Sequence, residues 1–175
     1  TIIGIPCNTA HSIEIFEVIK KLIISNNLNI NLLNMIDEVN KYIEKEFSSV
    51  KKVGILSTTG TYKSKVYDKT FDSNKFDLIY PDFNIQEKFV HDSIYNPDYG
   101  IKSVYPVSKK AKDNLIFAIE HLNFKKVEII ILACTELPLA IQDKKYKNIS
   151  FVDSTFVLAN SLIKEFYSQK RNNYL

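Results

Sequence analysis

The chain has 175 residues, of which 45% are hydrophobic and 25% charged, and its formal net charge is +3. Its lysines are scattered singly or in pairs between acidic residues, so no basic stripe marks a nucleic-acid-binding surface. No apolar run approaches the roughly 20 residues that span a bilayer, and the N-terminus lacks the pattern of a signal peptide. We therefore expect a cytoplasmic protein whose partners include neither nucleic acid nor a membrane.

A chain of this length can bury a sizeable core, as one domain or as two small lobes, without a metal or a disulfide. Its two cysteines are too few for a disulfide framework, and we expect both to be free thiols. His91 and His121 have no Cys, Asp or Glu at metal-ligand spacing, so we predict no metal site.

Short β-branched runs alternate with amphipathic helical stretches, a pattern that favours an α/β fold with a mostly parallel sheet. The predicted strands cover residues 2–6, 30–35, 52–57, 76–80, 127–132 and 149–152. The predicted helices cover residues 10–25, 37–47, 60–67, 84–93, 108–122, 135–142 and 154–169. Between two of these helices, Pro97 and Gly100 indicate a shaped loop over residues 94–106 in which function could lie.

One local pattern occurs twice. Ile2-Ile-Gly-Ile-Pro-Cys7-Asn-Thr9 and Ile129-Ile-Ile-Leu-Ala-Cys134-Thr-Glu136 are both apolar strands followed by a cysteine, a small polar residue and a helix. The carboxyl ends of parallel strands form the ligand crevice in such sheets, because helix N-termini there offer unpaired N–H groups. The two cysteines are therefore expected to face each other across one cleft.

This position suits proton transfer. The positive end of a helix dipole lowers the pKa of a thiol and populates the thiolate, which is a usable base. Two such groups, one thiolate and one thiol, can remove a proton from one face of an amino-acid α-carbon and return a proton to the other face, without a cofactor. Hydroxyl and amide groups can bind the α-carboxylate and stabilise the developing charge. The candidates are Asn8, Thr9, Thr59, Thr61 and Thr135.

Each of these residues also has an ordinary structural interpretation. A single cysteine at a strand end is more often a small buried hydrophobe than a catalyst, and the matched pair reverses that expectation. Capping could explain one threonine of Gly54-Ile-Leu-Ser-Thr-Thr-Gly-Thr61, although hardly the whole cluster. His11 lies one helical turn after Cys7, where a surface role and a role in tuning the thiol are equally plausible.

Three segments resemble the signature segments of the aspartate/glutamate racemase family, in that family's order. They are Ile5-Pro-Cys-Asn-Thr-Ala-His11, Gly54-Ile-Leu-Ser-Thr-Thr-Gly-Thr61 and Leu132-Ala-Cys-Thr-Glu-Leu-Pro138. Additional similarity in Tyr99-Gly-Ile-Lys102 and Phe151-Val-Asp-Ser-Thr155 extends the resemblance over nearly the whole chain. Glu136 follows Thr135 where glutamate racemases usually have histidine, which favours the aspartate racemase branch.

The resemblance implies two pseudo-symmetric α/β lobes with the substrate between them. Residues 1–48 would form a partial first lobe, 49–150 the second lobe, and 151–175 a helix returning to the first lobe. The first lobe is expected to be truncated, because the family's usual N-terminal βαβα segment is not among these residues. Cys7 and Cys134 would be the acid/base pair, Lys102 would bind the substrate, and no cofactor would be needed. An exposed first-lobe sheet predicts association, most simply as a homodimer.

The leading hypothesis is therefore an amino-acid racemase, an isomerase that prefers aspartate or glutamate. One alternative is a catalytically inactive racemase remnant that at most binds amino acids. Another is a thiol redox protein, which is disfavoured because the cysteines are not in a C-x-x-C arrangement. Decarboxylase or isomerase chemistry with a single cysteine is disfavoured because both cysteines are present.

Overall fold

A computed structural model describes residues 1–172 of the chain. Its seven strands form a two-stranded sheet, in the order β1-β2, and a five-stranded sheet, in the order β4-β3-β5-β7-β6. All pairs are parallel except β6 with β7. The strands are β1 (Ile2–Gly4), β2 (Asn31–Leu33), β3 (Lys52–Ser57), β4 (Asp77–Ile79), β5 (Ile129–Ala133), β6 (Lys145–Tyr146) and β7 (Ile149–Asp153). The expected α/β class is confirmed.

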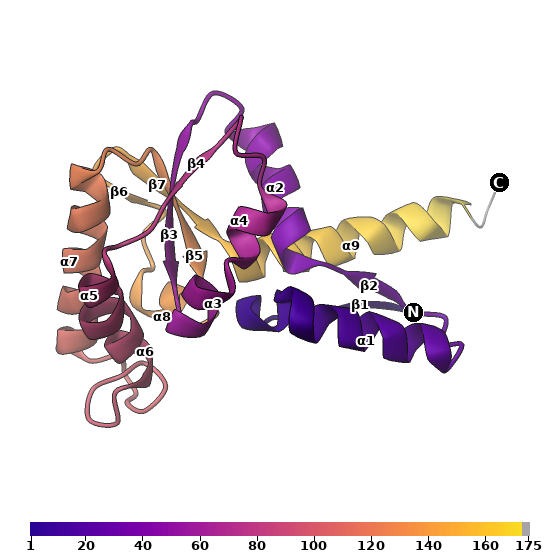
Figure 1. The fold of residues 1–175 in the computed structure, drawn as a ribbon, viewed down its shortest axis with the longest axis horizontal. Coiled ribbons are helices and arrows are strands. Elements are labelled where there is room, and N and C mark those ends of the chain that lie inside the picture. Colours follow the sequence, from indigo (N-terminus) through magenta and orange to yellow (C-terminus); the bar gives the residue numbers. More distant parts are fainter. Residues whose placement is uncertain (173–175) are drawn as a thin grey trace.

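Helices separate most of the strands and cover the sheets (Figure 1). The α-helices are α1 (Ile13–Ser25), α2 (Met35–Glu46), α3 (Thr59–Ser64), α4 (Val66–Thr70), α5 (Phe83–Ile85), α6 (Asp92–Tyr95), α7 (Lys109–Phe124), α8 (Leu137–Ala140) and α9 (Ser154–Asn172). A 3₁₀ helix, η1 (Asn8–His11), precedes α1, and a π-helical segment, η2 (Gln86–His91), joins α5 to α6. None of the helices within residues 1–172 combines the length and apolar character that a bilayer crossing requires.

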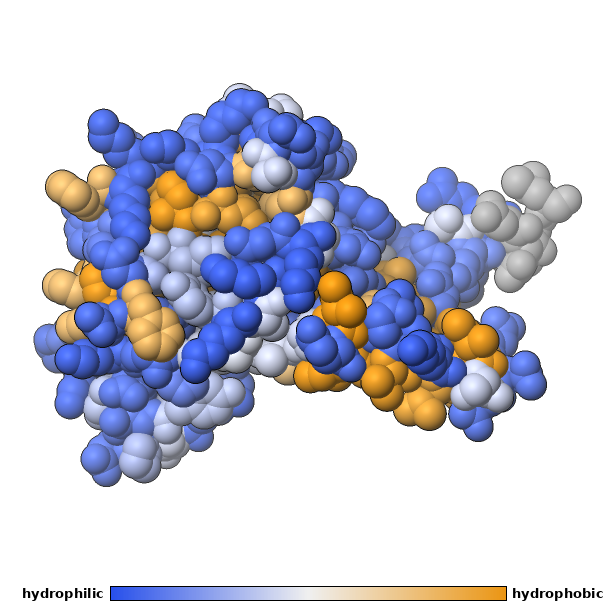
Figure 2. All heavy atoms as spheres, in the orientation of Figure 1, coloured by the Kyte–Doolittle hydropathy of each residue, from blue (hydrophilic) through white to orange (hydrophobic). Residues whose placement is uncertain are grey.

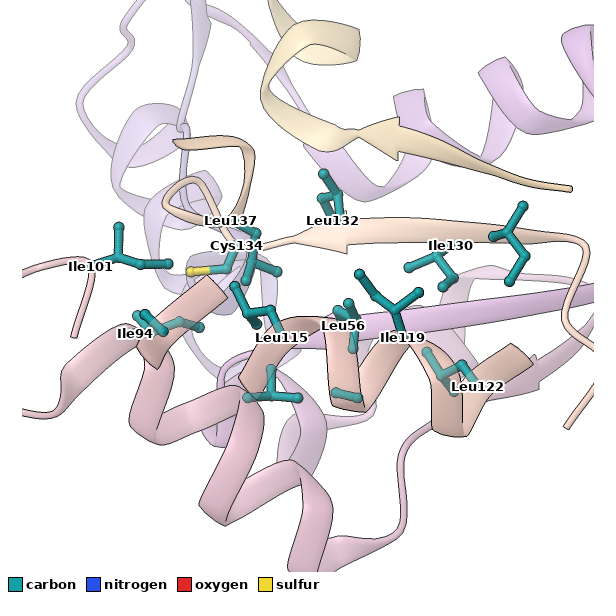
Figure 3. Packing of buried hydrophobic residues seen from close by; sticks show 14 of the residues in the cluster. Leu56, Ile94, Ile101, Leu115, Ile119, Leu122, Ile130, Leu132, Cys134 and Leu137 are labelled. Carbon is teal, nitrogen blue, oxygen red and sulfur yellow. The ribbon is translucent and has the colours of Figure 1, made fainter. Parts of the chain in front are cut away.

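The alternation of side chains along β5 builds two cores, one on each face of the five-stranded sheet. Ile129 and Ile131 face a cluster formed mainly with α2 and α4. Ile130 and Leu132 face a second cluster formed mainly with α7, η2 and α6. Cys134 stands at the end of the second cluster in Figure 3, with its sulfur on the side of Ile101 and away from Ile130. The packing of the strand thus fixes where this thiol lies.

The small sheet lies beside the large one and is joined to it by α9. This helix leaves β7, contacts β1, β2 and α2, and lies on the opposite side of the small sheet from α1 in the view of Figure 1. Asp153 starts α9 as an N-cap, because its Oδ1 accepts hydrogen bonds from the backbone N–H groups of Thr155 and Phe156 at 2.8 and 3.1 Å. The expected boundary at residue 150 falls within β7, which belongs to the large sheet.

Four elements differ from those predicted. The helix predicted over 135–142 is shortened to the four residues of α8. The helix predicted over 60–67 is broken at Lys65, whose left-handed backbone (φ 53°) ends α3 and starts α4. The helix predicted over 84–93 contains the π-helical segment η2. The short strand β6 was not predicted, and it forms an antiparallel hairpin with β7 around Lys147, which has φ 52°.

Candidate active site

Both cysteines line the same pocket, which has a volume of about 210 Å³. Cys7 follows β1 of the small sheet, and Cys134 follows β5 of the large sheet. The pocket is lined by residues 6–9 after β1, Thr58 and Thr61 at α3, Tyr95 and Lys102, and residues 133–136 at the end of β5. The strand-end pattern that occurs twice in the sequence therefore contributes both of its copies to one site.

Cys7 is exposed and lies where the chain turns from β1 into η1. The strand β1 ends at Gly4, and after Pro6, which has no N–H for a ladder bond, Cys7 adopts an extended conformation as the N-cap of η1. The Nδ1–H of the buried His11 donates to the Cys7 backbone carbonyl at 2.9 Å. Burial lowers the pKa of His11, so this side chain is a neutral support for the Cys7 turn.

Cys134 has a contrasting environment, because only 6% of its surface is exposed. Its thiol donates to Oε2 of Glu136 at 2.9 Å. Burial, followed by this hydrogen bond to a carboxylate, raises the pKa of Cys134 to about 12. The expectation that a helix dipole lowers this pKa is wrong for Cys134, since α8 has only four residues and begins after Glu136.

Asn8 is buried and its side chain connects three elements beneath the pocket. Its Oδ1 accepts a hydrogen bond of 2.7 Å from the Tyr67 hydroxyl on α4. Its Nδ2 donates at 3.2 Å to Ser154 at the start of α9, and Ser154 in turn donates to the Leu132 carbonyl at 2.9 Å. The Asn8 amide therefore fixes the turn after Cys7 against α4, α9 and β5.

Threonines that follow a strand of each sheet meet at the pocket, Thr9 after β1 and Thr58 and Thr61 after β3. Thr9 Oγ1 lies 2.8 Å from Thr61 Oγ1 and 3.3 Å from Thr58 Oγ1. Thr58 is the N-cap of α3, because its hydroxyl accepts from the Thr61 N–H at 3.3 Å. Thr59, expected among the binding residues, lies outside the pocket lining, and its hydroxyl donates to Glu87 instead. Because Thr58 is the N-cap, it lines the pocket in place of Thr59, which was expected there.

Lys102 reaches the pocket from the loop between α6 and α7. The loop closes tightly, since a Cβ at Gly100 would lie 2.6 Å from the Asn96 carbonyl oxygen, and the Lys102 N–H donates to the Ile94 carbonyl at 3.1 Å. Lys102 Nζ lies 4.8 Å from the centre of the Tyr95 ring, a cation–π contact. Lys102, which was expected to bind the substrate, lines the same pocket as the two cysteines.

Glu136 connects the charged and thiol groups of the pocket. Oε1 lies 3.2 Å from Lys102 Nζ, and Oε2 accepts hydrogen bonds from Cys134 and, at 3.0 Å, from the Thr135 hydroxyl. Burial alone would raise the pKa of Glu136, but the hydrogen bonds from Cys134, Lys102 and Thr135 outweigh it and hold that pKa below its usual value. Sequence reasoning missed Glu136 as a site residue, as it missed Thr58 and Tyr95.

The described part of the chain holds no cluster of side chains arranged as a metal site. Within residues 1–172, no three His, Cys, Asp or Glu side chains lie together in a way that could hold a metal ion. The polar side chains of the pocket carry two thiols, one ammonium, one carboxylate, the Asn8 carboxamide, and the hydroxyls of threonines and of Tyr95. Such a set can bind a small zwitterion and exchange protons with it.

Together, the fold and the pocket define an α/β protein in which strand-end cysteines from two sheets share a small polar pocket. The family model described as Asp/Glu/Hydantoin racemase matches residues 1–162, and the chain therefore belongs to this family.

Several proteins resemble the chain individually. It is 31% identical over 128 residues to a Pectobacterium carotovorum subsp. carotovorum protein described as an uncharacterized protein in the pnlA 3′ region, covering 72% of this chain and 80% of that one. It is 28% identical over 164 residues to the broad specificity amino-acid racemase RacX of Bacillus subtilis (strain 168), covering 94% and 64%. The solved Picrophilus torridus aspartate racemase is 31% identical, with a TM-score of 0.71 and coverage of 94% and 61%.

The fold extends to more distant structures. An aspartate racemase homologue from Pyrococcus horikoshii OT3 superposes with a TM-score of 0.67 at 24% identity, covering 93% of this chain and 65% of that one. The chain spans 61% of the Picrophilus torridus racemase and 64% of RacX.

Proposed function

We propose that the chain racemises an amino acid by two-base proton transfer at the α-carbon, with Cys7 and Cys134 as the two bases. The observation that carries this proposal is that the two cysteines, each following a strand of a different sheet, line one pocket of about 210 Å³. Membership of the racemase family supports the same reaction. The reaction requires no cofactor, because each of its steps is a proton transfer.

In each turnover, one sulfur is a thiolate and the other a thiol. The thiolate takes the Cα proton, the electron pair of the C–H bond stays on the substrate, and the thiol donates its own proton to the opposite face of Cα. The roles of the two sulfurs are then exchanged. Proton transfer by a positioned group of this kind typically contributes ~10²–10⁴-fold to the rate.

The remaining lining residues supply binding. The Thr9 and Thr61 hydroxyls, which are hydrogen-bonded to each other, leave one donor for the α-carboxylate and for charge that develops on it. The Thr135 hydroxyl donates to Glu136 and offers its lone pairs to the substrate ammonium, while Asn8 holds the Cys7 turn in place. Lys102 is the one cation among the described lining residues, and it favours a substrate with a second carboxylate, aspartate or glutamate. A small-molecule amino acid is thus the proposed partner, and a homodimer is the proposed assembly.

The test is proton NMR of L- and of D-aspartate in D₂O with no added cofactor, which reports α-proton exchange, together with the optical rotation of the same samples, which reports the enantiomer. The wild-type protein should exchange the α-proton for deuterium and produce the other enantiomer, because each thiol equilibrates with the solvent. Cys7→Ser and Cys134→Ser should each abolish interconversion, since an alcohol is essentially never ionised in water. Circular dichroism confirms that the variants are folded. Exchange that survives the double replacement would show that another group is the base.

The same samples separate racemisation from its main competitor, amino-acid binding without catalysis. A chain that only binds would broaden or shift the aspartate signals while the α-proton signal keeps its intensity. Glutamate and a neutral amino acid, examined in parallel, report whether Lys102 selects a second carboxylate.

A further inference from the structure

The Glu136 carboxylate lies in the pocket, yet proton transfer between two thiols does not require it. We propose that Glu136 is a positioning residue that keeps Cys134 protonated in the resting protein, so that Cys134 enters the first turnover as the acid. This inference rests on the proposed racemisation, and it adds which sulfur carries the proton when the substrate arrives.

The contact between the two side chains requires a proton on the sulfur. Cys134 Sγ lies 2.9 Å from Glu136 Oε2, and a thiolate at that distance from a carboxylate would place two negative charges in contact. Cys134 is also buried, which disfavours its charged form. Both the charge beside the sulfur and its burial therefore favour the thiol.

The neighbours of Glu136 keep the carboxylate ionised, and it must be ionised to have this effect. Lys102 Nζ lies 3.2 Å from Oε1, and the Thr135 hydroxyl donates to Oε2 at 3.0 Å. Burial alone would lower the pKa of Lys102, but the hydrogen bond to Glu136 and the charge of its carboxylate outweigh burial and hold that pKa above its usual value. The ion pair is therefore intact at neutral pH, with Glu136 between the ammonium and the thiol.

The other titratable groups around Cys134 do not replace this role. Tyr67, on α4, is fully buried, and burial raises its pKa, so its phenol stays neutral. Tyr95, on α6, lies against Lys102. Cys7, across the pocket, is exposed, and its sulfur has no hydrogen bond to a carboxylate among residues 1–172. The two sulfurs therefore differ in a way that their matched sequence contexts do not suggest.

This difference between the two sulfurs determines which of them is the base in the first turnover. Cys7 takes the Cα proton of the first substrate, and Cys134 gives its own proton to the opposite face. The turnover then leaves a thiolate beside Glu136, and this thiolate recovers a proton from water while Cys7 loses one. An enantiomer that presents its Cα proton to Cys134 reacts only when Cys134 is the thiolate and Cys7 the thiol, which is the less populated protonation state of the pair.

The test is a pH titration of the protein without substrate, labelled with [β-¹³C]cysteine. The two cysteines give two resonances, and Cys7→Ser identifies the signal of Cys134. Glu136→Gln should lower the titration midpoint of Cys134 by about one pH unit or more, the usual effect of removing a like charge at this distance. Lys102→Met should raise the midpoint, because it removes a nearby positive charge.

Glu87→Gln is the matched control, because Glu87 bonds to Thr59 and lies outside the pocket lining, and it should leave the midpoint unchanged. A Cys134 midpoint that is the same in wild type and Glu136→Gln would overturn the proposal. If Glu136→Gln does not fold, Glu136→Ser takes its place, and a Cys134 midpoint that is the same in wild type and Glu136→Ser overturns the proposal equally. No turnover is measured, so failure of the proposed racemisation would appear only in the separate aspartate exchange experiment.

Discussion

The Tyr67 hydroxyl donates a hydrogen bond of 2.7 Å to Oδ1 of Asn8, which ties the residue after Cys7 to α4 on the large sheet. Tyr67→Phe keeps the buried ring and leaves this buried oxygen without its donor. Loss of a buried partner typically costs ~1–3 kcal/mol, so we expect the free energy of unfolding in urea to fall by about that amount. Asn8 should also become more mobile, which would lower any α-proton exchange activity.

Tyr42→Phe is the matched control, since the Tyr42 hydroxyl makes no hydrogen bond to the described residues. Its free energy of unfolding should stay within about 0.5 kcal/mol of wild type, as is usual for surface changes. Equal losses for the two variants would show that the Tyr67–Asn8 bond contributes nothing specific.

Much of the fold was predictable because apolar periodicity is strong in its central strands. The strand predicted over 52–57 matches β3, and the one predicted over 127–132 overlaps β5. The break at Lys65 was not predictable, because no glycine or proline marks that left-handed residue. The hairpin of β6 was missed for the same reason, since Lys147 has a positive φ without a turn signature. Such local backbone choices are decided by tertiary packing.

The site was predictable where a residue type and a strand end coincide. Cys7 and Cys134, and with them Asn8, Thr9, Thr61, Thr135 and Lys102, all line the pocket. In a run of two adjacent threonines, however, only the backbone determines which one becomes the cap, and it is Thr58. Glu136 was read as a marker of the family branch, although a carboxylate two residues after a strand-end cysteine was a usable signal. Its contact with Lys102 depends on a loop whose path periodicity does not reveal.

The hydroxyls of Thr9 and Thr61, 2.8 Å apart, should couple the two sheets energetically. We expect a double-mutant cycle of Thr9→Val and Thr61→Val to give a coupling free energy of about 0.5–1.5 kcal/mol in urea denaturation. Thr70→Val serves as the control partner, because the Thr70 hydroxyl bonds within its own helix to the Val66 carbonyl. A cycle of Thr9→Val with Thr70→Val should be additive. Coupling in neither cycle would mean that the Thr9–Thr61 contact does not stabilise the fold.

Folding stability should depend on pH through Cys134. Its pKa is about 12 in the folded protein, against an ordinary value of 9.0. Between these values the unfolded chain loses the thiol proton and the folded chain retains it, so the contribution to stability is complete below pH 9.0 and is lost as the pH rises toward 12. A single group gives a slope of at most ~1.4 kcal/mol per pH unit. The measurement is the free energy of unfolding in urea at several pH values between about 8 and 10.5, for wild type and for Cys134→Ala. The variant should lack the part of the pH slope that Cys134 contributes.

The helix α1 should make the protein self-associate. Phe16 is its one buried residue, whereas Ile13, Ile15, Val18 and Leu22 are exposed, and Figure 2 shows apolar side chains gathered in this region. Exposed apolar surface of this kind drives association. We expect light scattering to find a dimer or larger assembly, and Leu22→Lys to shift it toward the monomer. Ile116→Lys, on the far helix α7, is the control and should leave the mass unchanged, because Ile116 is exposed apart from this surface. A wild-type monomer at all concentrations would contradict the prediction, as would equal masses for wild type and Leu22→Lys.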